Sequence, residues 1–117
     1  MRPPRTIAAA LTAVVAVVSL AACGGGSATA TLGPGEVQIA NFAFTPSTLT
    51  VHVGETVTWL FDQPGVPHNV YSTGGPVHFE SPGYQSSGTF RFTFTTAGTY
   101  TYVCQIHPNM VGTIVVS

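Results

Sequence analysis

Beyond its N-terminal segment, this 117-residue chain contains several short apolar stretches with a two-residue period. Turn residues separate these stretches. Side chains alternate between the two faces of a β-strand, so this period predicts strands rather than helices. The candidate strands lie at residues 37–44, 48–53, 56–61, 69–72, 88–94, 98–103 and 112–116. Strands of this length and spacing predict an all-β fold, a Greek-key β-sandwich of about seven to eight strands.

The same alternation identifies the core. The residues predicted to line it are Val51, Val53, Val57 and Trp59 in the early strands, and Phe90, Phe92, Phe94, Tyr100 and Tyr102 in the later ones. The segment between Pro64 and Ser87 has turn residues and little periodicity, so we expect loops there around one weak strand.

The N-terminus has the features of a secretory signal. Arg2 and Arg5 precede an apolar run over residues 7–20, which is too short to span a bilayer comfortably. The run ends in Leu-Ala-Ala-Cys-Gly at residues 20–24, which resembles the bacterial lipoprotein processing box, where the cysteine is lipidated and becomes the first residue. The alternative is an ordinary signal peptide cut near Ala22. Both place the mature protein outside the cytoplasm, and lipidation of Cys23 would anchor it to the periplasmic or cell-surface side of a membrane.

The chain thus divides into a signal peptide (1–22), a tether rich in Gly, Ser, Ala and Thr (23–35) and one small domain (36–117). Lysine is absent, and removal of the signal leaves a single arginine, Arg91, against four acidic residues. Without a basic patch, nucleic-acid binding and electrostatic docking on anionic lipid are both disfavoured.

The cysteine count bears on the chemistry. If Cys23 is acylated, Cys104 has no partner for an intramolecular disulfide in an oxidising compartment. A lone cysteine is either buried as an inert small hydrophobe or held by a metal. His107 and Met110, which follow at intervals of three residues, favour the metal.

A thiolate, an imidazole and a thioether on one short loop are the ligands that soft copper prefers. An electron-transfer copper site adds a second imidazole, and His68, in the segment Val66–Val70, is the candidate. The sequence therefore predicts one copper ion bound by His68, Cys104, His107 and Met110. His52 alternates with core valines and His78 lies in the segment of low periodicity, so neither is expected to bind it.

With these ligands, the domain resembles the cupredoxins, the small blue copper proteins that include plastocyanin, pseudoazurin and amicyanin. The resemblance covers residues 36–117 and rests on Phe42, Phe44, Pro46, Val51, Gly54, Thr56, Val57, Trp59, Pro67, His68, Asn69, Val70, Phe79, Ser81, Gly88, Phe90, Phe94, Gly98, Tyr100, Tyr102, Cys104, His107, Met110, Gly112 and Val115. The short spacing from Cys104 to Met110 is similar to that of amicyanin. The segment 60–65 departs from the family pattern, which leaves the loop before His68 unassigned.

The resemblance implies a role for several further residues. Asn69 would brace the two ligand loops by hydrogen bonding, and Pro108, whose φ is fixed, would stiffen the second loop. Electrons would pass through the exposed edge of His107, inside a small apolar docking patch that includes Val66, Pro67 and Pro108.

A full set of ligands leaves no coordination position for a substrate, and no acid and base pair lies elsewhere, so the sequence argues against an enzyme. We expect a monomeric electron carrier that cycles between Cu(I) and Cu(II) and meets transient redox partners on the outer face of the membrane. The alternatives are a copper-binding or copper-delivery lipoprotein and, less in keeping with the ligand set, a sandwich without metal.

Overall fold

The computed structural model describes Pro4 and residues 32–117. Most of the predicted signal peptide, Cys23 and most of the tether lie outside these residues. Within the described part of the chain, no helix has the length and hydropathy needed to cross a membrane.

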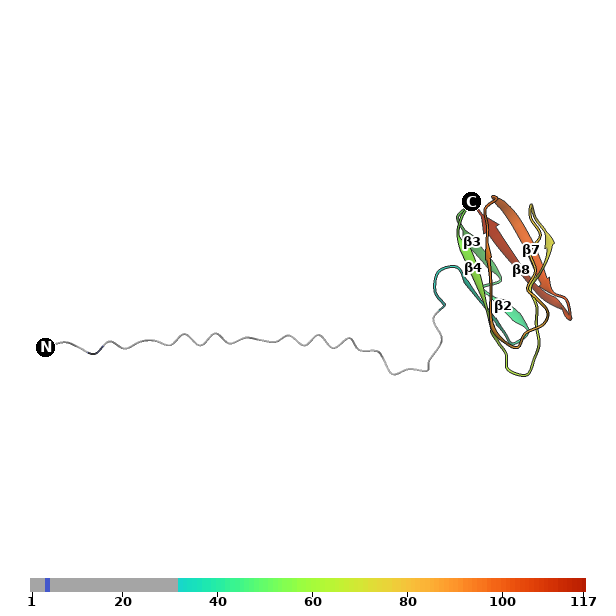
Figure 1. Ribbon diagram of the computed structural model, residues 1–117, viewed down its shortest axis with the longest axis horizontal. Coiled ribbons are helices and arrows are strands. Elements are labelled where there is room, and N and C mark those ends of the chain that lie inside the picture. Colours follow the sequence, from blue (N-terminus) through green and yellow to red (C-terminus); the bar gives the residue numbers. More distant parts are fainter. Residues whose placement is uncertain (1–3, 5–31) are drawn as a thin grey trace.

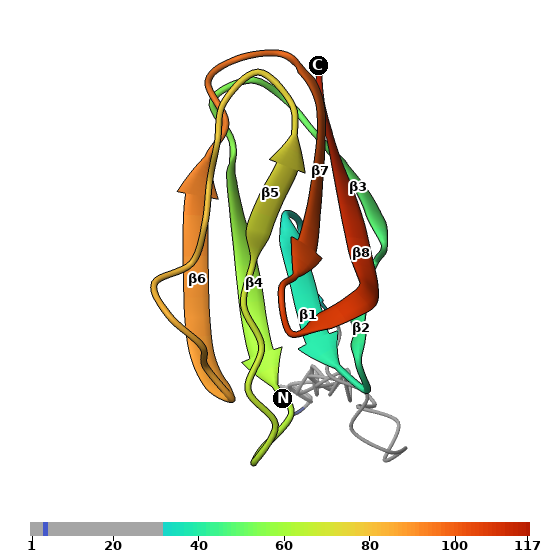
Figure 2. The same cartoon turned by 90° about the vertical axis from the view of Figure 1, so that its right-hand side faces the viewer.

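The domain contains eight strands in two sheets (Figures 1 and 2). One sheet has the order β2-β1-β4-β6 and the other the order β3-β8-β7-β5. The strands are β1 (Glu36–Ala40), β2 (Ala43–Thr45), β3 (Thr48–Val51), β4 (Thr56–Asp62), β5 (Tyr71–Gly74), β6 (Ser87–Thr93), β7 (Gly98–Cys104) and β8 (His107–Val116). The predicted all-β sandwich is therefore confirmed.

Several predicted strands have different bounds in the structure; among them, the strand predicted at 48–53 ends at Val51 and the one predicted at 69–72 is Tyr71–Gly74. The stretch 37–44 is two strands, because Asn41 and Phe42 form a tight turn and Ala40 pairs with Ala43 across it. The last strand begins at His107 instead of residue 112, so it includes part of the predicted ligand loop. The weak strand expected between residues 64 and 87 is β5.

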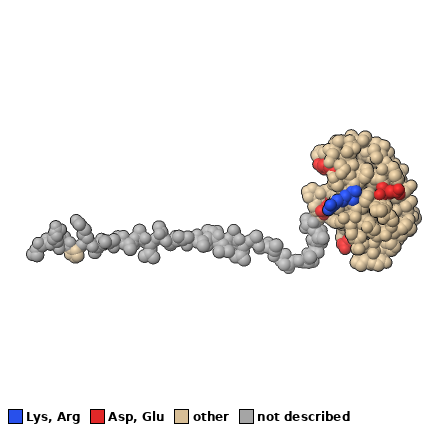
Figure 3. Space-filling model, in the orientation of Figure 1, with Lys and Arg blue, Asp and Glu red and all other residues tan. Residues whose placement is uncertain are grey.

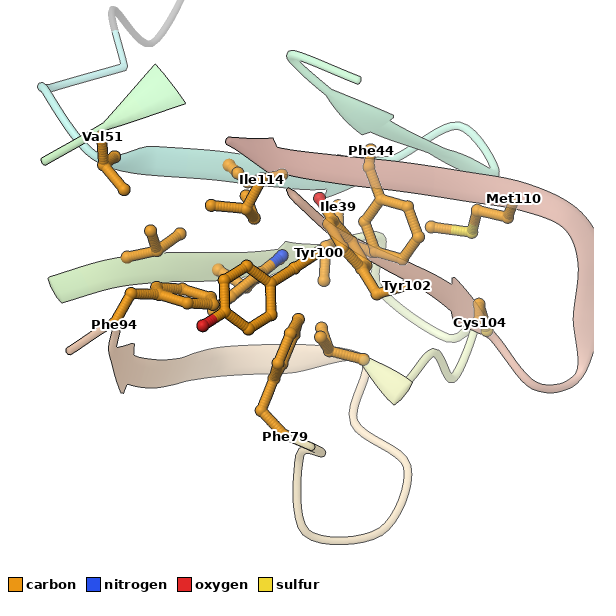
Figure 4. Packing of buried hydrophobic residues seen from close by; sticks show 14 of the residues in the cluster. Ile39, Phe44, Val51, Phe79, Phe94, Tyr100, Tyr102, Cys104, Met110 and Ile114 are labelled. Atoms are coloured by element: carbon orange, nitrogen blue, oxygen red, sulfur yellow. The ribbon is translucent and has the colours of Figure 1, made fainter. Parts of the chain in front are cut away.

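The core lies between the two sheets (Figure 4). Within it, Trp59 contacts Phe90 of its own sheet and Tyr102 of the other. Trp59, Phe94, Tyr100 and Tyr102 are fully buried, as the two-residue period predicted. Phe90 and Phe92 are only partly buried, since β6 is an edge strand. The prediction for Val53 was wrong: β3 ends at Val51, and the side chain of Val53 is 48% exposed.

The strands β1, β4 and β7 all end at the same end of the sandwich (Figure 2). Their following connections are the turn at Asn41–Phe42, the long segment that contains His68, and the turn at Gln105–Ile106. Three segments that are distant in sequence are thereby brought to one end of the core, and we call it the copper end below because the predicted ligands are there.

Candidate metal centre

The hairpin formed by β7 and β8 supplies two of the predicted ligands. Cys104 is the last residue of β7, His107 is the first residue of β8, and the two are paired across a two-residue turn. Tyr100, Tyr102 and Cys104 alternate inward along β7, so the thiol is fully buried. The turn brings the Sγ atom of Cys104 to 3.4 Å from Nδ1 of His107.

His68 reaches the same point from the segment that follows β4. Its backbone exchanges two hydrogen bonds of 2.9 Å with that of Gln85, which holds the residue in an isolated bridge. The imidazole is fully buried. Its Nδ1 lies 3.8 Å from Sγ of Cys104 and 3.1 Å from Nδ1 of His107. One sulfur and two nitrogens therefore converge, all within 4.8 Å of one another.

Met110 completes the predicted set from within β8. The strand alternates between exposed and buried positions, and Met110 is on the buried side. Figure 4 shows Met110 and Cys104 at the same end of the core cluster. In copper sites of this class the axial ligand binds the metal only weakly. A buried thioether suits this position because packing holds the side chain in place without a strong bond to the metal.

The electrostatics suit a bound cation. Burial, and then the proximity of His107, lower the pKa of His68 below its usual value of 6.5. The imidazole is therefore neutral at physiological pH, as metal coordination requires. Cys104 is a free cysteine, and its buried sulfur beside two imidazoles is the donor chemistry of copper rather than of magnesium or calcium.

Hydrogen bonds of Asn69 connect the two ligand segments. Asn69 Nδ2–H donates to Oε1 of Gln105, and Asn69 Oδ1 accepts from the backbone N–H of Gln105, both at 2.8 Å. These bonds join the segment of His68 to the turn between Cys104 and His107, where bracing by Asn69 was expected.

Sequence reasoning missed Gln63, whose Oε1 lies 2.8 Å from Nε2 of His68. The polar side chain five residues before His68 was the available signal, but it fell in the unassigned loop.

The surface around the ligands is apolar. Pro67 and Pro108 are exposed and Val66 is half-buried. Sequence reasoning missed three larger apolar side chains at this end, those of Phe42, Ile106 and Val111, which are 53%, 44% and 57% exposed. On the face of the molecule seen in Figure 3, the lower end is mostly tan, and most of the charged side chains lie over the middle and upper part.

The other two histidines are separate from this cluster. His52 is exposed at the opposite end of the sandwich, with Nδ1 at 3.5 Å from Oγ of Ser117. His78 is also exposed, and its Nδ1 lies 2.7 Å from Oγ of Ser72. The residues that converge are His68, Cys104 and His107, in agreement with the expectation that His52 and His78 do not bind copper.

A two-sheet sandwich with a buried cysteine between two histidines defines a cupredoxin-type metalloprotein. The chain also matches, over residues 34–117, the family of copper binding proteins of the plastocyanin/azurin type. It is 39% identical to the amicyanin-alpha of Methylorubrum extorquens over 114 residues, which cover 93% of this chain and 94% of that protein. The chain therefore belongs to the plastocyanin/azurin family of copper-binding proteins.

Solved structures agree with this assignment. A reduced amicyanin variant superposes with a TM-score of 0.63 at 38% identity, over 73% of this chain and 83% of that one. The copper-containing nitrite reductase of Thermus scotoductus has a TM-score of 0.62 at 34% identity over 72% of this chain, but the match spans only 22% of that enzyme. The match to the amicyanin variant, in contrast, spans most of both chains.

Family and geometry together give this protein one type 1 copper site, formed by His68, Cys104, His107 and Met110. The protein is an amicyanin-like electron-transfer protein and not an enzyme.

Proposed function

We propose that this protein is an electron shuttle on the outer face of a membrane, held there by a lipid on Cys23 at the start of the tether over residues 23–35. The observation that supports it most directly is the position of His107. Its ring is only half-buried although Nδ1 lies within the ligand cluster. One side chain thus connects the metal position to the surface.

Bound copper supplies one-electron chemistry through its Cu(I) and Cu(II) states. The protein holds the thiolate and both imidazoles in place, because each ligand is fixed by a strand or by backbone hydrogen bonds. A site that moves little between oxidation states exchanges electrons rapidly, since little reorganisation accompanies the transfer. The apolar surface around His107 suits small contacts that form and dissociate quickly with redox partners.

The test of the copper function is the visible absorption and electron paramagnetic resonance of the Cu(II)-loaded protein, with a Cys104→Ser variant alongside. We expect an intense thiolate-to-copper band and a narrow copper hyperfine splitting, both lost in the variant and both reversibly bleached by a reductant. His78→Gln is the matched control and should retain them. A colourless copper complex, or one that a reductant does not bleach reversibly, would favour copper storage or delivery instead.

The anchor is tested separately by expressing the full chain in a bacterium and determining the mass of its mature N-terminal peptide. An acylated Cys23 at the N-terminus, with the protein in the membrane fraction, supports the proposal. A Cys23→Ala variant should be released from that fraction. An unmodified N-terminus and a soluble wild-type protein would contradict the anchor but leave the electron-transfer function unaffected.

A further inference from the structure

The turn between β1 and β2 has an unusual backbone. Asn41 has φ of 52° and Phe42 has φ of 57°, so both occupy the left-handed region. Two-residue hairpin turns of this kind favour Asn followed by Gly, because glycine has no Cβ to oppose a positive φ. Asparagine is thus in its preferred place here, whereas a bulky aromatic residue stands where glycine is expected.

The ring of Phe42 is more than half exposed, so burial in the core does not explain its presence. It does contact both histidine ligands edge-on. Its centroid lies 4.9 Å from that of His107, at an interplanar angle of 81°, and 5.8 Å from that of His68, at 78°. These distances and angles are those of favourable edge-to-face aromatic pairs. The left-handed turn therefore places one ring against both imidazoles.

Gln63 connects this turn to His68. Its Oε1 lies 3.1 Å from the backbone nitrogen of Phe42 and 2.8 Å from Nε2 of His68. A backbone N–H can only donate, so the atom of Gln63 that faces it must be the carbonyl oxygen, which can only accept. The Nε2 atom of His68 therefore carries its proton, and Nδ1 has a free lone pair directed toward Cys104 and His107.

From these contacts we propose that Gln63 and Phe42 are positioning residues of the copper site, and that the β1–β2 turn is its third loop. Gln63 holds the His68 ring in the orientation and tautomer that bind copper. Phe42, held in the left-handed conformation by the same carboxamide, restricts the movement of both imidazoles and keeps water from the edge of His107. The inference builds on the copper electron-transfer function proposed above.

Two variants separate these roles. Gln63→Leu removes the acceptor of His68, which makes the imidazole a poorer donor to Cu(II), so the reduction potential should rise. Gln63→Glu keeps an acceptor oxygen and should not show this rise. Phe42→Gly removes the ring and admits water to His107, which favours the more highly charged oxidised site, so the potential should fall. Val53→Ala, a change at an exposed apolar residue of the opposite end, should leave it at the wild-type value.

A readout without copper keeps the inference independent of the proposed function. In the metal-free protein, the Nε2–H proton of His68 should exchange with solvent at least tenfold faster in Gln63→Leu than in wild type, with Gln63→Glu close to wild type. Phe42→Gly should not lower the free energy of unfolding, because glycine relieves the strained φ.

These measurements can also overturn the inference. Unchanged potentials in both variants, together with unchanged exchange in Gln63→Leu, would mean that the turn is not part of the site. A loss of stability in Phe42→Gly without a change in potential would make Phe42 merely structural. If the wild-type protein itself lacked a type 1 spectrum, the proposed function would fail, and the exchange rates would still decide whether Gln63 holds His68.

Discussion

The end of the sandwich that carries Val53 and Ser117 is closed by backbone, whereas the copper end is closed by side chains. At the first end, the N–H of Val53 donates to the carbonyl oxygen of Ser117 at 3.0 Å, and the N–H of Gly54 donates to that of Phe94 at 2.7 Å. The left-handed residue of this turn is glycine, with φ of 91°. Such a turn makes few demands on the other side chains.

At the copper end, backbone hydrogen bonds hold His68 to Gln85, but the connections between the three segments are made by side chains. Gln63 and Asn69 supply the hydrogen bonds that join its three segments. In its β1–β2 turn, Asn41 and Phe42 take the left-handed conformation, whereas Gly65 takes it in the segment before His68. A bulky residue in that region costs about 1–3 kcal/mol, which functional sites tolerate when the surrounding structure holds the conformation. Among the residues that the structure describes, the non-glycine residues with positive φ therefore lie at the end that binds the metal.

The largest effect on stability is expected between the two ends, in the hairpin of β7 and β8 that they share. A Cβ added at Gly112 would overlap the buried ring of Tyr102. Gly112→Ala should therefore lower the free energy of unfolding by about 3 kcal/mol, measured by urea denaturation. Combining it with Tyr102→Leu should give less than the sum of the two single changes, because the smaller side chain makes room. Strict additivity would show that the overlap is relieved elsewhere.

At the copper end, Asn69→Ala should lower the free energy of unfolding of the metal-free protein by about 2 kcal/mol, since the N–H of Gln105 loses its acceptor. Gln38→Ala is the matched control. It removes one exposed hydrogen bond of 2.9 Å to Asp62, and should change stability by less than about 0.5 kcal/mol. Equal losses in the two variants would contradict the view that side-chain hydrogen bonds close this end.

At the opposite end, Gly54→Ala should cost about 1 kcal/mol, because no atom lies within 4 Å of the added Cβ and only the positive φ opposes it. Asparagine tolerates this region better, so Gly54→Asn should cost less. Both variants should keep the wild-type copper spectrum. A spectral change in either would mean that the two ends are coupled through the sheets.

The smallest effect concerns pH. The pKa of His68 in the folded protein is below its unfolded value of 6.5, so on acidification the unfolded chain binds this proton first. The contribution of neutral His68 to the stability of the metal-free protein is therefore fully present above pH 6.5. It declines as the pH falls from 6.5 toward the lower pKa that His68 has in the folded protein. Urea denaturation across pH 5 to 8 measures the decline. His68→Gln should flatten it over that range, and an unchanged slope would assign it to other groups.

Sequence reasoning predicted the sandwich and the metal ligands because both depend on local pattern. Alternation over two residues sets which face of a strand is buried, as with Tyr100 and Tyr102. The chemistry of Cys104, His107 and Met110 is evident from residue type and spacing. Where the pattern ended, the prediction was wrong: Val53 continues the alternation of β3 in the sequence, but the chain has already turned at that point.

By itself, the sequence determined the fold class, the copper ligands and the family, since these follow from periodicity, residue chemistry and recognisable motifs. Only the tertiary structure decided that Gln63 and Phe42 belong to the site. Phe42 is 26 residues before His68 and 65 before His107, and nothing local in the sequence relates them. Parallel pairing of β1 with β4 brings their ends together, and the hydrogen bond between Phe42 and Gln63 exists only once that sheet has formed.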